Sequence, residues 1–140
     1  HSPERVIPGR IFEELVNKAE TLVKKLGLHF QVSKLAAGDI SHSMARTYDI
    51  EVYIPSIGIY KEVSSASNAR DYQARRGMIR YRDKETGKTR YCHTLNASGL
   101  ATSRIFPALL EQYQQEDGSV LIPEVLQPFM GGIKVLKPIK

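Results

Sequence analysis

The feature that most constrains this chain is an alternating stretch that runs directly into a turn. Between Arg46 and Ile54 every second residue is suited to burial, and the residues between them are mostly polar or charged. A period of two is typical of a strand with one buried face. Residues 55–58, Pro-Ser-Ile-Gly, have turn composition, and a return strand is predicted from Ile59 to Ser65. The chain is therefore committed to an antiparallel hairpin.

Segments with helical spacing lie on both sides of this hairpin. Apolar residues recur every three or four positions across residues 11–26, between Pro8 and Gly27, and again from Gly99 to a point before Asp117. A short helix is predicted at residues 71–76, strands at 29–35, 78–82, 90–94 and 120–122, and a frayed tail from residue 131. Hairpins with helices at either end predict an α+β fold, an antiparallel β-sheet flanked by helices, in one domain over residues 1–140.

The net charge of +5 comes from one segment of the chain. Residues 70–90 hold eight basic and three acidic side chains, so the remainder of the 140 residues is balanced. A basic block of this kind either attracts phosphate-bearing partners or forms a solvated surface. Charge alone leaves both interpretations open.

Residue types exclude several other classes of site. Cys92 is the only cysteine, which excludes an internal disulfide and a cysteine-rich metal site. The histidines lack zinc-ligand spacing, and Cys92 and His93 are expected to lie in a strand. No serine lies in a G-x-S-x-G elbow, and there is no Walker A or dinucleotide-binding motif. No apolar run approaches the length of a membrane span, so no membrane partner is expected.

The expected register of the hairpin brings two carboxylates together. If the four-residue turn closes a regular hairpin, Glu51 faces Glu62 and Asp49 faces Ser64. Like charges directly opposite each other destabilise a sheet. The pair can be accommodated by exposure to water, by an arginine, or by a divalent cation such as Mg²⁺, which prefers oxygen ligands.

Six strings in a fixed order are together specific. They are AGDI (37–40), RTYDIEVYIPS (46–56), YKEVSSASN (60–68), DYQARRGMIRYR (71–82), HTLNASGLATSR (93–104) and YQQEDGSVLIPEVLQPFMGG (113–132). With these strings the chain resembles the C-terminal part of the catalytic domain of a seryl-tRNA synthetase, a class II aminoacyl-tRNA synthetase. The resemblance implies a portion of the antiparallel class II core, and a serine–tRNA ligase that uses ATP and Mg²⁺ to form seryl-adenylate and then charges tRNA(Ser).

The resemblance also implies roles for individual residues. The EVSS segment, Glu62-Val63-Ser64-Ser65, would bind ATP together with Arg104, and Glu62 and Ser65 would reach the metal. Glu62 and Arg104 are therefore the expected catalytic residues, and the N-x-S-G match implies that Asn96 and Ser98 bind serine. Simple alternation points Ser65 away from Glu62, so a β-bulge near Ser64 is expected.

The basic block is compatible with RNA, and Arg75 and Arg76 are its candidate RNA contacts. The resemblance implies a homodimer for the intact enzyme and a cytoplasmic location, with the mitochondrial matrix as the alternative. Two alternative functions stay open: a non-catalytic paralogue that binds RNA or protein, and a ligase that loads an amino acid onto another acceptor.

Some positions depart from the family pattern. Ala66, Ala97 and Ser103 replace the usual Cys, Gly and Gly, and Pro107 falls inside the second long helix. An interior proline removes a helical hydrogen bond, so a kink is expected there unless the first turn of the helix reaches it. The first two class II signatures do not occur in these residues. We therefore expect an incomplete catalytic domain that has little or no aminoacylation activity alone.

Overall fold

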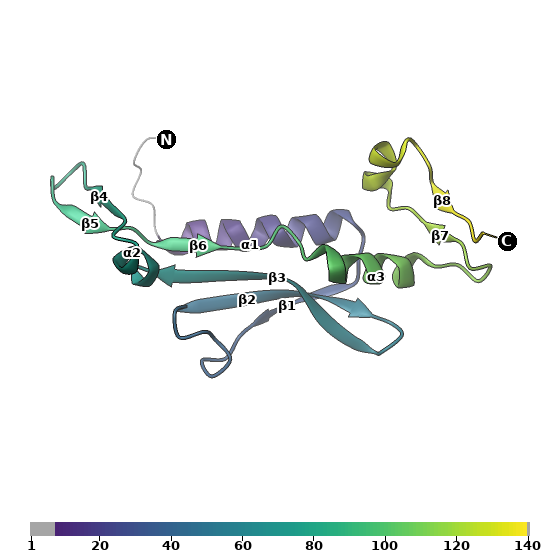
Figure 1. The fold of residues 1–140 in the computed structure, drawn as a ribbon, viewed down its shortest axis with the longest axis horizontal. Helices are drawn as coiled ribbons and strands as arrows, with labels where there is room; N and C mark the ends of the chain where they lie inside the picture. The colour runs from purple at the N-terminus through teal and green to yellow at the C-terminus, as the bar shows by residue number, and fades with distance from the viewer. Residues whose placement is uncertain (1–7, 140) are drawn as a thin grey trace.

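The computed structural model describes residues 8–139, and its centre is a four-stranded antiparallel sheet in the order β1-β2-β3-β6 (Figure 1). The strands are β1 (Phe30–Lys34), β2 (Arg46–Ile54), β3 (Ile59–Arg70) and β6 (Thr94–Asn96). The α+β class and the antiparallel sheet with flanking helices confirm the sequence prediction. None of the described helices is long and apolar enough to cross a membrane.

Two helices, α1 (Pro8–Lys25) and α3 (Thr102–Tyr113), cover the same face of the sheet. The alternating residues Ile50 and Val52 of β2 are fully buried and pack with Val23 of α1 and Ile105 of α3. Burial of apolar side chains from three elements supplies the main stabilisation of this arrangement. The opposite face of the sheet carries the polar residues of the alternation.

The chain leaves α1 through Gly27, as the sequence predicts. Gly27 has φ +67°, a left-handed conformation that favours glycine and commonly ends helices. A Cβ atom at this position would also collide with the Tyr113 hydroxyl, which donates a hydrogen bond to the carbonyl of Leu26 at 2.6 Å. Gly27 thus allows α3 to approach the end of α1 closely.

The predicted register of the long hairpin is correct up to Glu62 and wrong beyond it. Tyr53 pairs with Tyr60 and Glu51 with Glu62, but the register then shifts and Asp49 pairs with Ser65 rather than with Ser64. The shift is a β-bulge that leaves Val63 as the extra residue, which confirms the expected bulge near Ser64. The strand β3 also continues to Arg70, beyond the predicted end at Ser65.

The segment between β3 and β6 contains a short helix and a second, two-stranded sheet. It consists of α2 (Tyr72–Arg76) and a two-stranded hairpin, β4 (Arg80–Arg82) with β5 (Thr89–Tyr91). This β4–β5 hairpin has shorter arms than predicted. Cys92 and His93 lie between β5 and β6, outside any strand, so their assignment to a strand was wrong.

The end of the described chain is ordered by long-range pairing. The prediction of a frayed tail from residue 131 was wrong. The strand β8 (Val135–Leu136) pairs with β7 (Val120–Leu121), and a 3₁₀ helix, η1 (Glu124–Met130), lies between them. The tail lacks a clear periodic pattern, and its contacts with β7 and η1 stabilise it. The helix α3 runs through Pro107 to Tyr113 without interruption, although Pro107 lies beyond its first turn.

Candidate active site

The bulge in β3 brings Glu62 and Ser65 to the same face of the sheet. Val63 and Ser64 are both buried, Val63 in the core and Ser64 through a hydrogen bond from its hydroxyl to the carbonyl of Ser98 at 2.7 Å. Because both bulge residues turn to the covered side, the residues on either side of them face the open side. The register agrees, since Glu62 pairs with Glu51 and Ser65 with Asp49.

Arg104 reaches Glu62 from the first turn of α3. The amide of Ala101 donates to the carbonyl of Val63 at 2.7 Å, which fixes the start of the helix beside the bulge. The Arg104 Nη1 atom then donates to the Glu62 carbonyl at 2.8 Å and lies 3.8 Å from the Glu62 Oε2 atom. About half of each side chain is exposed, 51% for Arg104 and 44% for Glu62, so the pair adds little stability. Both groups remain accessible to a ligand.

Glu62 and Arg104 share an open cleft of about 450 Å³. Its other lining residues are Ile54, Ile57, Lys61, Ser103 and Pro107. Ser103 and Pro107, two of the departures from the family pattern, therefore form part of the cleft wall. With an arginine, a lysine and a carboxylate at its surface, the cleft can hold an anionic ligand and a cation together.

The carboxylate pair predicted from the register is accommodated by separate partners. The Glu51 Oε2 atom accepts hydrogen bonds from the Gln31 amide at 2.6 Å and the Ser33 hydroxyl at 3.0 Å. Glu62 instead faces Arg104. The sequence left three ways to accommodate the two carboxylates, and the structure shows an arginine beside Glu62. The uncharged hydrogen-bond donors that β1 provides to Glu51 were not predicted.

Asp49 is a further polar residue of the open face that sequence reasoning did not select. Only 8% of it is exposed, and its Oδ1 atom has no hydrogen-bond partner among the described residues. Thr47 and Ser67, also buried, share a hydroxyl hydrogen bond at 2.9 Å. The alternation that predicted β2 places Thr47 and Asp49 beside Glu51 on one face, so the pattern itself contained the signal.

The two residues expected to bind serine lie at the end of β6 and just after it. Asn96 pairs with Ser67 across β3 and β6 and is exposed, so it lies on the open side with Ser65. Ser98 is exposed just after β6, where its carbonyl is held by Ser64. The structure thus brings Glu62, Ser65 and Asn96 to one face and holds Ser98 close to the bulge.

The two candidate RNA contacts lie away from the cleft, on α2. Arg75 forms an ion pair with Asp71 at 2.7 Å, and this pairing lowers the pKa of the Asp71 carboxyl. The Arg76 guanidinium lies over the Tyr72 ring at 4.0 Å from its centroid. Tyrosines were not selected from the sequence, yet they accompany the arginines throughout this segment.

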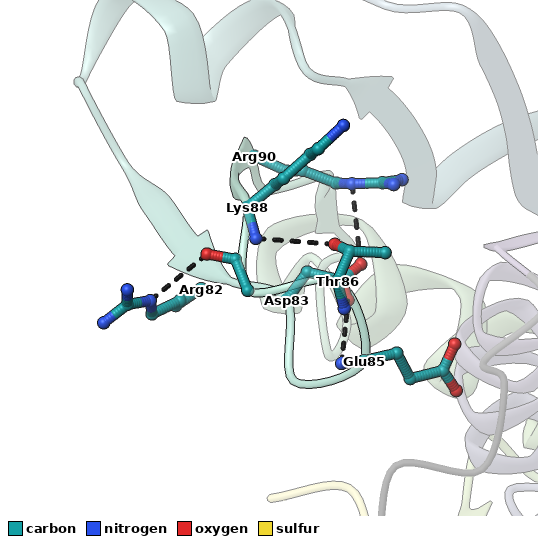
Figure 2. A network of polar contacts seen from close by, with 7 residues as sticks. Arg82, Asp83, Glu85, Thr86, Lys88 and Arg90 are labelled. Atoms are coloured by element: carbon teal, nitrogen blue, oxygen red, sulfur yellow. Dashed lines mark hydrogen bonds and ion pairs between the residues drawn. The ribbon is translucent and has the colours of Figure 1, made fainter.

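The tip of the β4–β5 hairpin is held by a polar network rather than by a core (Figure 2). The Asp83 Oδ1 atom accepts the amides of Glu85 at 3.0 Å and Thr86 at 2.9 Å, and its Oδ2 atom lies 3.5 Å from Arg90 Nε. The hydrogen bonds from Thr86 and Glu85 and the charge of Arg90 lower the pKa of Asp83. A carboxylate that closes its own turn in this way makes the tip rigid.

Comparison with known proteins shows which family this chain resembles in sequence and structure. The family described as tRNA synthetase class II core domain (G, H, P, S and T) matches residues 1–113. The serine–tRNA ligase 2 of Clostridium acetobutylicum is 68% identical over 123 residues, which are 88% of this chain and 29% of that protein. The chain therefore spans less than a third of the length of this relative.

Two solved structures superpose on nearly the whole chain. The seryl-tRNA synthetase from Pyrococcus horikoshii complexed with ATP has a TM-score of 0.88 and 43% identity, and the match covers 94% of this chain and 29% of that one. The cytoplasmic serine–tRNA ligase from Naegleria fowleri in complex with AMP has a TM-score of 0.87 and 34% identity, with 99% and 29% covered.

Proposed function

This chain belongs to the class II tRNA synthetase core-domain family, among the seryl-tRNA synthetases, and from that premise we propose that it forms part of the catalytic domain of a serine–tRNA ligase. The enzyme would activate serine with ATP as seryl-adenylate and transfer the seryl group to tRNA(Ser). The observation that carries this proposal is the meeting of Glu62 and Arg104 in one cleft. Residues 1–140 would form one portion of that domain.

In this proposal the cleft binds ATP. Arg104, on a helix start anchored at the bulge, would bind the nucleotide, and the segment Glu62-Val63-Ser64-Ser65 would lie along it. The names of the two solved relatives, one with ATP and one with AMP, support a nucleotide ligand. Pairing with the Glu62 backbone carbonyl fixes the direction of the Arg104 side chain before the ligand arrives, which reduces the entropy lost on binding.

Glu62 and Ser65 would hold Mg²⁺. Among residues 8–139 there is no group of three or more His, Cys, Asp or Glu side chains arranged to share a metal ion. One carboxylate, from Glu62, and one hydroxyl, from Ser65, fit Mg²⁺, which is usually bound by one or two carboxylates plus substrate phosphates. The bulge supports this assignment because it places a carboxylate and a hydroxyl on the same face. When bound, the ion would neutralise charge on the phosphates.

The reaction itself requires little covalent chemistry from the protein. Attack of the serine carboxylate on the α-phosphorus forms one P–O bond and breaks another as pyrophosphate leaves. Positioning of the two reactants and stabilisation of the developing charge then supply the rate enhancement. Arg104 would contribute charge stabilisation, and Glu62 would act through the metal.

Asn96 and Ser98 would bind the serine substrate. Both are exposed, Asn96 on the open face and Ser98 just after β6, and a pocket for a small hydroxyl substrate needs polar groups. Such a pocket discriminates against alanine because its own polar groups would be left without partners. The hydrogen bond from Ser64 to the Ser98 carbonyl links this pocket to the bulge.

RNA binding would use the basic segment, with Arg75 and Arg76 as its first contacts. Arg76 has no ion pair among the described residues, whereas Arg75 shares its charge with Asp71. We also propose a homodimer, in line with the family resemblance. A cytoplasmic location is supported by the name of the Naegleria relative, with the mitochondrial matrix as the alternative.

Serine-dependent exchange of labelled pyrophosphate into ATP by the full-length protein tests this function. Arg104→Ala and Glu62→Ala should each lower the exchange rate by about two to three orders of magnitude. Arg10→Ala, at an exposed arginine of α1, is the matched control and should leave exchange unchanged. Wild-type exchange in both site variants would refute the assignment, and a full-length protein without exchange would favour a non-catalytic paralogue.

A further inference from the structure

A second open cleft, of about 340 Å³, lies where the β4–β5 hairpin meets α1 and β6. We call it the hairpin groove. Its lining residues are Ile11, Asn68, Tyr81, Arg90, Tyr91, His93 and Leu95. Figure 1 shows the β4–β5 hairpin and α3 at opposite ends of the sheet. Asn68 lies six positions after Glu62 along β3, which corresponds to roughly 20 Å.

The hairpin groove is separate from the candidate active site. Leu95 packs against the buried cluster of Phe12, Val16 and Ala66 beneath α1, so the groove lies on the helix-covered side of the sheet. Asn96, the next residue of β6, faces the open side, because successive side chains of a strand point in opposite directions. The thickness of the sheet therefore lies between the groove and the proposed serine pocket.

The groove is lined by two tyrosine rings and the Arg90 side chain, and two more arginines lie beside one of the rings. Tyr81 is 48% exposed at its rim. The Tyr91 ring has two guanidinium groups near it, Arg75 at 5.1 Å and Arg80 at 4.9 Å from its centroid. Flat rings stack on nucleobases of any sequence, and arginine binds the adjoining phosphates. All of the net positive charge of the chain lies within residues 70–90, which supply this rim.

The remaining polar groups suit the edge of a base. The Asn68 Oδ1 atom accepts the amide of Arg70 at 2.8 Å, so its amino group is left to donate. His93 is exposed beside it and adds a ring nitrogen. Arg90 is paired in register with Tyr81, which places a cation next to a stacking surface. The Asp83 network holds Arg90 and the hairpin tip in place before any ligand binds (Figure 2).

We propose that the hairpin groove binds one unpaired nucleotide of tRNA, with the base stacked on Tyr81 and a phosphate on Arg90. This inference rests on the proposed function in one respect, because the proposed function identifies the bound RNA as tRNA. An unstacked base that fills an aromatic pocket is the usual mode of contact with single-stranded RNA. The groove would therefore contribute to RNA affinity and make no contribution to serine activation.

Filter binding of a tRNA(Ser) transcript to the full-length protein, over a series of salt concentrations, tests the proposal. Tyr81→Ala should weaken binding by about tenfold, and Tyr81→Phe, which keeps the ring, should bind within about twofold of the wild type. Arg90→Gln should lower the salt slope by about one, as expected for the loss of one phosphate contact. Arg10→Gln is the matched charge control and should leave the slope unchanged.

Pyrophosphate exchange separates this proposal from the proposed function, because exchange uses no RNA. All four variants should exchange pyrophosphate at the wild-type rate. Wild-type tRNA affinity in Tyr81→Ala together with a wild-type salt slope in Arg90→Gln would refute nucleotide binding in the hairpin groove. An equal loss of tRNA affinity in Tyr81→Ala and Tyr81→Phe would also refute it. If Tyr81→Ala also loses pyrophosphate exchange, that variant has lost its fold. The salt slope of tRNA binding by Arg90→Gln then decides whether the groove binds RNA. Absence of exchange in the wild type would refute serine activation without affecting the groove.

Discussion

The two hairpins of this chain are built in different ways. The β2–β3 hairpin is long and buried on one face, and its residues Ile50, Val52 and Val63 are fully inaccessible to solvent. The β4–β5 hairpin has three residues in each arm, mostly exposed, and is closed by the hydrogen bonds of Asp83. A hairpin stabilised by a core can carry an irregularity such as the bulge without loss of the fold. A hairpin stabilised by polar contacts can expose its charges for binding.

The largest expected effect concerns the core of the β2–β3 hairpin. Ile50→Ala should lower the free energy of unfolding by about 3 kcal/mol, because it removes buried methylene groups and leaves a cavity. Tyr81→Ala in the β4–β5 hairpin should change it by less than about 0.5 kcal/mol. Urea unfolding of the two variants and the wild type measures both changes in the free energy of unfolding. Equal losses would show that the two hairpins share one source of stability.

The next effect concerns a buried polar pair within the long hairpin. Thr47→Val should cost about 1–2 kcal/mol, because the Ser67 hydroxyl would be left buried without its partner. The double variant Thr47→Val/Ser67→Ala should recover part of that loss, since neither hydroxyl is then present. A double-mutant cycle measured by thermal unfolding gives the coupling. Additive losses would mean that the hydrogen bond contributes nothing.

A smaller, local effect is expected for the tip of the β4–β5 hairpin in acid. The folded pKa of Asp83 lies below the ordinary value of 3.8, so its contribution is present above that value and is lost as pH falls through the lowered pKa. The amide resonances of Glu85 and Thr86 should titrate with this carboxyl in NMR spectra, while those of β2 stay unchanged. A midpoint at or above 3.8 would contradict the role given to Asp83.

The smallest effect concerns the exposed ion pair on α2. Arg75→Gln should return the lowered pKa of Asp71 toward 3.8, because the Arg75 hydrogen bond is the main cause of the shift. The melting temperature should not change measurably, since exposed pairs of this kind contribute little. NMR titration of the Asp71 carboxyl measures the shift. An unchanged Asp71 pKa in the variant would exclude Arg75 as its cause.

Local pattern predicted the hairpin that carries Glu62, and the family resemblance supplied the other candidate site residues. The alternation of β2 and the four-residue turn are enough to pair Tyr53 with Tyr60 and Glu51 with Glu62, because a short turn leaves few registers available. The resemblance in the EVSS and N-x-S-G strings predicted which residues would lie together. The need for a bulge followed from the conflict between that resemblance and simple alternation.

Other features depended on contacts between distant parts of the chain. The strand β7 was predicted at residues 120–122, but β8 has no local signal, and it forms by pairing with β7. The hairpin groove combines Ile11 with Tyr91, residues eighty positions apart, so no local window contains it. Tyrosines in the basic segment look like ordinary strand residues until arginines from α2 and β4 are placed over them.

By itself, the amino-acid sequence determined the α-helices, the two hairpins, the basic segment and the family. These depend on short periodicities, turn residues and motif strings, which act over a few positions. Only the tertiary structure decided that Val63 is the extra residue of the bulge and that Glu51 accepts hydrogen bonds from β1. The reason is that each of these outcomes depends on which distant groups are buried together, and burial is a property of the folded chain.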